Sequence, residues 1–131
     1  MLTIRQEQWE ALRLGRVEDF KCRMRQHLHE FFTLQCQALG EAGIGNLIDV
    51  GTSRASTYGI EIERDVCVFI DLMIELGQDF DSDAHLPWVE EILNDPDMPD
   101  PSGRIRRLYD ESRRYLADRE QIGAAFSSEF G

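Results

Sequence analysis

The stretch from residue 61 to residue 76 constrains the fold of this chain most, because it is apolar around most of a helical circumference. Apolar residues recur at intervals of three and four, which places one set of them on a single helix face. The opposite face is also largely apolar, and only Asp71 and Glu75 form a thin polar stripe. Such a helix is normally buried among neighbours, and this one is too short and too charged to span a bilayer. The first face consists of Ile62, Val66, Phe69, Ile70 and Met73.

Helical patterns also precede and follow this stretch. Thr3 and Gln6 have the spacing of a capping box, and the apolar stripe of residues 17–31 continues after Gly15, where we expect a bend or a break. A glycine-rich turn at residues 40–45 leads to another apolar segment, which we expect Gly59 to close in a left-handed conformation.

Glycine and proline mark the remaining boundaries. Gly77 should end the central helix, and Pro87 suits the first position of the next one, where its missing N–H costs nothing. The run Asn94–Pro101 contains three prolines and predicts an exposed loop. A last amphipathic helix covers residues 105–116, with a basic face that includes Arg104.

These patterns predict an all-α fold. At 131 residues, 42% of them hydrophobic, the chain has the size of one domain with a real core. We expect a single-domain bundle of about five or six helices over residues 1–122, arranged around the central helix at about 61–76. Residues 123–131 show no periodicity and predict a flexible tail.

The charge of the chain is concentrated in its middle. Residues 41–103 carry fifteen acids and two bases, while the segments on either side are nearly neutral, and the net charge is −11. Such a field repels nucleic acid and anionic membranes, and it favours basic protein partners or cations. The alternative is an acidic surface that only keeps the protein in solution.

Cysteines and histidines do not predict a metal site or a bound cofactor. Cys22, Cys36 and Cys67 are odd in number, far apart and without a CxxC pair, which indicates reduced thiols. His27 and His29 are two residues apart on a helix and point to different faces. Because charged residues also interrupt the N-terminus before any apolar run, we expect no secretory signal and a cytoplasmic protein.

One acidic segment matches part of a calcium-binding EF-hand loop. Ala84 stands where the loop needs glycine, and Pro87 falls at position nine although it suits a helix start. The alternative is an acidic turn with Phe80 and Trp88 packed beneath it. The candidate ligands, at positions one, three, five and twelve, are Asp79, Asp81, Asp83 and Glu90.

No residue pattern predicts catalysis. The chain lacks a phosphate-binding glycine loop, a nucleophile elbow and a Cys–His pairing, so we expect no enzyme. Asp65 and Asp71 lie on the central helix, where a structural ion pair with Arg54 or Arg64 is favoured over an acid–base role.

Four residues are candidates for binding a protein partner. Arg54 and Tyr58 are four residues apart and share a helix face, although packing of Tyr58 against the next helix explains it equally well. Phe80 and Trp88 are expected to be exposed aromatic anchors within the acidic region.

A long spaced pattern runs through about residues 1–95 and includes no catalytic signature. It consists of 2-LTIRQ-6, Phe20, His27-Leu28, Phe31, Arg54-Ala55, 58-YGIE-61, 63-ERDV-66, 69-FIDLM-73, Leu76-Gly77, 79-DFD-81 and 86-LPW-88. In this pattern the chain resembles small helical proteins encoded in bacterial type VI secretion clusters, beside PAAR-tip proteins, effectors and their adaptor chaperones.

The resemblance implies a co-chaperone that binds an effector adaptor chaperone in the cytosol before secretion, and through it the effector. Two other functions stay open: an immunity protein that neutralises a cognate toxin, and a calcium-responsive helical module. We expect no nucleic-acid or membrane partner, and the apolar surface allows either a monomer or a homodimer.

Overall fold

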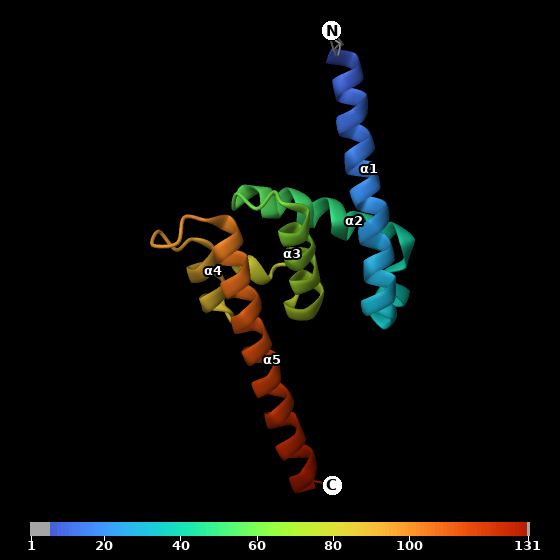
Figure 1. The fold of residues 1–131 in the computed structure, drawn as a ribbon. Helices are drawn as coiled ribbons and strands as arrows, with labels where there is room; N and C mark the ends of the chain where they lie inside the picture. Colours follow the sequence, from blue (N-terminus) through green and yellow to red (C-terminus); the bar gives the residue numbers. More distant parts are fainter. Residues whose placement is uncertain (1–5, 131) are drawn as a thin grey trace. The chain divides into compact units, whose positions relative to one another are not determined.

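The computed structural model describes residues 6–130, and the side chains of residues 15–120. It confirms the all-α prediction: these residues form five α-helices and one short 3-10 turn, with no strand among them (Figure 1). The elements are α1 (Gln6–Phe31), α2 (Thr33–Thr57), α3 (Glu63–Leu76), η1 (Phe80–Ser82), α4 (Pro87–Leu93) and α5 (Pro101–Phe130). The expected cap at Thr3 lies outside the described residues.

The chain divides into two compact units, Met1–Ser53 and Arg54–Gly131. The expectation of one domain over residues 1–122, followed by a tail at 123–131, stays a prediction. Helix α5 continues through residues 123–130 of that segment.

The first unit contains α1 and the part of α2 that ends at Ser53. Gly40 adopts φ 72° and ψ 169°, which breaks α2 at the glycine-rich turn that the sequence predicts, although residues 41–57 are again helical. Ion pairs then join α1 to the part of α2 that follows Gly40: Lys21 with Asp49 at 2.8 Å, and Arg25 with Glu41 at 3.0 Å.

The prediction of a bend or break at Gly15 was wrong, because α1 runs through this residue without interruption. A helical glycine costs only about 1 kcal/mol relative to alanine, which neighbouring helical residues offset.

The second unit is built on α3, which begins at Glu63, two residues later than expected. Ile62 precedes the helix and is 57% exposed, because it stands at the N-cap and not on the buried face. Val66, Phe69 and the two other predicted apolar positions are buried, as is Leu72. The ring of Phe69 lies 5.0 Å from that of Phe80, so α3 and η1 share one aromatic core.

Helices α3 and α4 both pack against α5, and η1 contacts α3 and α4. The predicted boundaries are confirmed at Gly77, which follows α3, and at Pro87, which opens α4. The predicted loop is shorter than expected, because Pro101 is the first residue of α5. Its ring supplies the φ angle of a first helical turn and needs no N–H partner there.

Candidate functional site

Two of the predicted partner-binding residues, Arg54 and Tyr58, converge on a buried carboxylate. The Tyr58 hydroxyl donates to Asp81 Oδ2 at 2.8 Å, and Arg54 Nη1 donates to Asp81 Oδ1 at 3.3 Å. Arg54 Nη2 also lies 3.2 Å from Asp79, and its Nη1 donates to the carbonyl of Gln78. Asp81 is only 6% exposed, so these bonds hold the end of α2 against η1.

This network accounts for the raised pKa of the Tyr58 hydroxyl. Burial, together with the hydrogen bond to Asp81 and its negative charge, raises the pKa of Tyr58 to about 12. A tyrosine that keeps its proton and a carboxylate paired with arginine form a structural network. The geometry therefore favours the packing interpretation of Tyr58 that the sequence left open.

The prediction that Phe80 is an exposed anchor was wrong. Its side chain is fully buried, because the 3-10 turn η1 directs it against Phe69. Trp88, in contrast, is half-buried, and its ring lies 5.5 Å from the ring of Tyr115 on α5.

The EF-hand-like segment does not fold as a calcium loop. Residues 80–82 form η1 and Pro87 begins α4, so the twelve positions do not wrap around a common centre. Arg54 forms ion pairs with the carboxylates of Asp79 and Asp81. Asp83 Oδ1 accepts a hydrogen bond from the His85 amide at 2.9 Å. Among the described residues, no three of the four candidate carboxylates bring their oxygens within 4.8 Å of one another.

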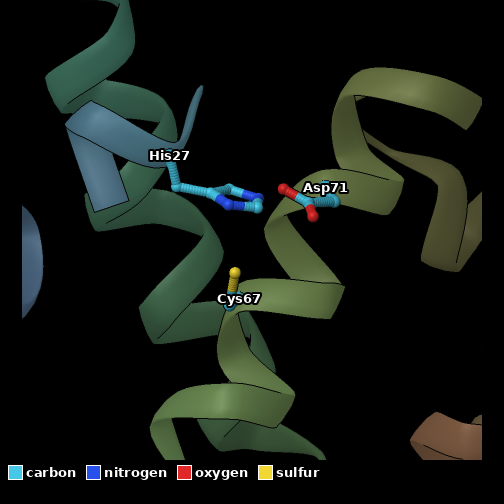
Figure 2. A group of neighbouring side chains, drawn as sticks. All are labelled: His27, Cys67 and Asp71. Carbon is cyan, nitrogen blue, oxygen red and sulfur yellow. The ribbon is translucent and has the colours of Figure 1, made fainter. Parts of the chain in front are cut away.

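The cysteine of α3, Cys67, is half-buried. Figure 2 shows Cys67 and Asp71 on successive turns of α3; His27, also drawn, belongs to the first unit. Burial and the nearby charge of Asp71 raise the pKa of Cys67 to about 11. A thiol with a raised pKa carries little thiolate at neutral pH and is therefore a weak nucleophile.

Arg104 is a structural residue that the sequence did not reveal. The helical pattern assigns it to the exposed basic face of α5, yet it is half-buried and donates to two carbonyls, Leu93 O at 2.6 Å and Tyr58 O at 2.8 Å. The Leu93 carbonyl lies at the end of α4, and the Tyr58 carbonyl follows the end of α2. At both places a cation interacts favourably with the helix dipole. Only the tertiary fold brings these positions together.

A groove of the second unit lies between α4 and α5 and has a volume of about 1020 Å³. Arg107 lies on its α5 side and pairs with Asp95 at 3.0 Å, while Glu90 and Glu91 are exposed on α4. Acidic and apolar groups therefore line the same groove. Its lining consists of the acids Glu90, Glu91, Asp95 and Glu111, the cation Arg107, Asn94, and the apolar Pro87, Trp88, Ile92 and Pro96.

Of the four predicted partner-binding residues, Trp88 alone lines this acidic groove. Two of the four acids have arginine partners, Asp95 with Arg107 and Glu111 with Arg114, while Glu90 and Glu91 keep their charge unpaired among the described residues. The groove therefore offers an aromatic edge and unneutralised carboxylates to a ligand.

No protein-family model, curated protein or solved structure matches this chain. Within the described residues, no helix has the length and apolar character needed to cross a bilayer.

Proposed function

We propose that this chain is a non-catalytic, protein-binding accessory factor, and that its partner is an effector adaptor chaperone of a type VI secretion cluster. The acidic groove between α4 and α5 carries the first part of this proposal. The sequence resemblance supplies the second part, the identity of the partner and the role as a co-chaperone in effector loading.

The size of the groove favours a segment of polypeptide as its ligand. Its volume of about 1020 Å³ lies at the upper end of the range of small-molecule pockets, roughly 300–1,000 Å³. The half-buried ring of Trp88 provides an anchor of the kind that is enriched in protein interfaces.

The negative charge of the groove favours a basic segment. No cation among the described residues pairs with Glu90 or Glu91, so a lysine or arginine side chain gains an attraction there without displacing an existing ion pair. A basic segment of an adaptor chaperone fits these requirements, and its binding weakens as salt screens the charges.

The first test is a pull-down from native host cells, with this protein as bait in the presence of EDTA, followed by mass spectrometry. The proposal expects an adaptor chaperone, with or without its effector. The variant Glu90→Lys/Glu91→Lys should lose this partner, while Asp118→Lys, which reverses an exposed charge on α5 outside the groove, should retain it. Equal recovery by both variants would remove the groove from the proposal.

The same experiment separates the immunity function, since a groove of this charge also suits the basic active site of a toxin. Recovery of a toxin without an adaptor, together with rescue of growth in toxin-expressing cells, would replace the co-chaperone assignment with immunity. A calcium-responsive module would instead show a rise in melting temperature on addition of Ca²⁺, which the observed η1–α4 geometry does not lead us to expect.

A further inference from the structure

A second and smaller pocket lies between α3 and α5, on residues that the acidic groove does not use. Its apolar wall is formed by Val68, Ile105 and Tyr109, and its volume is about 250 Å³. Arg64 and Arg106 also line it, together with the Asp65–Ser102 pair. The pocket therefore combines an apolar interior with two guanidinium groups.

The volume of the pocket favours a single side chain of a partner protein over a drug-sized small molecule. At about 250 Å³ the pocket holds several times the volume of one water molecule, roughly 30 Å³, yet it is smaller than the usual range for drug-sized ligands of about 300–1,000 Å³. A single apolar side chain of a protein partner matches this size.

The charge around the pocket is opposite to that of the unit as a whole. Residues 54–131 carry eighteen acids against eight arginines and no lysine. Two of those arginines line this pocket. Arg113, whose guanidinium carbon lies 4.9 Å from the centre of the Tyr109 ring, is paired with Glu75 and adds no free charge. The planar guanidinium binds carboxylates through two parallel hydrogen bonds, which makes arginine the favoured residue for recognising them.

The available donors belong to Arg106 and Arg64. Arg106 is exposed and has no ion-pair partner among the described residues, and Arg64 uses its Nε towards Asp65 at 3.6 Å, which leaves its two Nη groups. Asp65 is the one acid in the lining, but its side chain is 5% exposed and already accepts from Ser102. A ligand therefore meets the guanidinium groups more readily than the carboxylate.

We propose that the α3–α5 pocket binds an acidic segment of a partner protein, with one apolar side chain inserted between Val68, Ile105 and Tyr109 and its neighbouring carboxylates paired with Arg64 and Arg106. This surface is separate from the acidic groove and has the opposite charge preference. It gives the second unit two docking sites for segments of opposite charge.

The test uses two capped, fluorescently labelled peptides and the full-length protein. Both have a central leucine, flanked on each side by two glutamates in one peptide and by two lysines in the other. Fluorescence anisotropy gives the dissociation constants, and NMR spectra of the ¹⁵N-labelled protein locate each peptide. The glutamate peptide should shift the amide signals of Val68, Ile105 and Tyr109.

Arg106→Glu is the main variant, because Arg106 is exposed and its side chain makes no hydrogen bond or ion pair with another described residue. It should weaken the binding of the glutamate peptide roughly tenfold, since the charge reversal removes an attraction and adds a repulsion. Arg114→Glu reverses an exposed arginine on the same helix outside the pocket and should leave the affinity unchanged.

Three results would overturn this proposal: no binding of the glutamate peptide, shifts confined to residues outside the pocket, or equal weakening by Arg106→Glu and Arg114→Glu. The lysine peptide reports on the acidic groove instead. Its binding should survive Arg106→Glu and fail in Glu90→Lys/Glu91→Lys, so failure of either docking site is recognised independently of the other.

Discussion

Ser102 donates a hydrogen bond of 2.6 Å to Asp65 Oδ2 and thereby joins the first turns of α5 and α3. Asp65 is 3% exposed, and Arg64 Nε lies 3.6 Å from its other oxygen. The N-termini of helices carry partial positive charge, so a buried carboxylate beside two of them is favourably placed. The sequence predicted a structural ion pair for Asp65, and its contact with Arg64 confirms this.

Ser102→Ala should destabilise the protein by about 1–2 kcal/mol, because it removes a hydrogen bond to a buried charged group. Urea unfolding followed by circular dichroism measures this change. Ser56→Ala is the matched control: Ser56 makes only a 3.5 Å contact with Glu61 at an exposed position, and its loss should cost less than about 0.5 kcal/mol. Equal unfolding midpoints for the two variants would contradict the role assigned to Ser102.

Tyr58→Phe should destabilise the protein by about 1–2 kcal/mol near neutral pH, because Asp81 loses a hydrogen-bond donor. The pKa of Tyr58 is raised from 10.0 to about 12 in the folded protein, so its contribution is complete below pH 10 and is lost as the pH rises towards 12. Urea unfolding at several pH values should therefore show the two proteins converging in this interval. Tyr109→Phe serves as the control, because Tyr109 is 44% exposed and its hydroxyl donates to no acceptor among the described residues. A constant difference between wild type and Tyr58→Phe across pH 10–12 would argue against the Tyr58–Asp81 bond.

The sequence predicted most of the helices because their signals are local. The closing glycines and Pro87 depend on neighbouring residues, and these predictions were confirmed. Four of the five predicted apolar positions of α3 are buried as well, while Ile62 is exposed at the N-cap. The candidate site was harder to predict, because the faces of Phe80 and Trp88 depend on which elements pack beside them. A 3-10 turn buries Phe80 against α3, while α4 places Trp88 at a groove whose other side is α5.

The same limit explains Arg104, which a helical pattern cannot distinguish from an exposed arginine. Arg104→Leu should cost about 2–4 kcal/mol, because the carbonyls of Leu93 and Tyr58 lose their charged donor. Arg106→Leu, at an exposed position two residues away, should change stability by less than about 0.5 kcal/mol. Thermal unfolding compares the two directly, and similar melting temperatures would show that the bonds of Arg104 contribute little.

Glycine substitutions should have opposite effects at two positions. Gly59 has φ 78° in the turn that closes α2, where the Ile60 amide donates to Ala55 O at 3.0 Å, so Gly59→Ala should cost about 1–2 kcal/mol through strain in the left-handed conformation. Gly15 lies inside α1 with no other atom within 4 Å of an added Cβ, so Gly15→Ala should stabilise the helix by about 0.5–1 kcal/mol. Circular dichroism melts measure both changes, and a shift in the same direction for both would contradict the two backbone assignments.

The cysteines should differ in their rate of alkylation. Cys22 is exposed, whereas Cys36 is buried and its pKa is raised by burial and by the charge of Glu41. The pKa of Cys67 is raised from 9.0 to about 11, which lowers its thiolate fraction roughly a hundredfold at about pH 8. Iodoacetamide followed by peptide mass spectrometry should therefore modify Cys22 first, and all three cysteines should react at similar rates in urea. Because burial contributes more than Asp71 to the raised pKa of Cys67, Asp71→Asn should raise the alkylation rate of Cys67 only slightly. Labelling of Cys67 as fast as Cys22 in the folded protein would show that this thiol is not protected by α3.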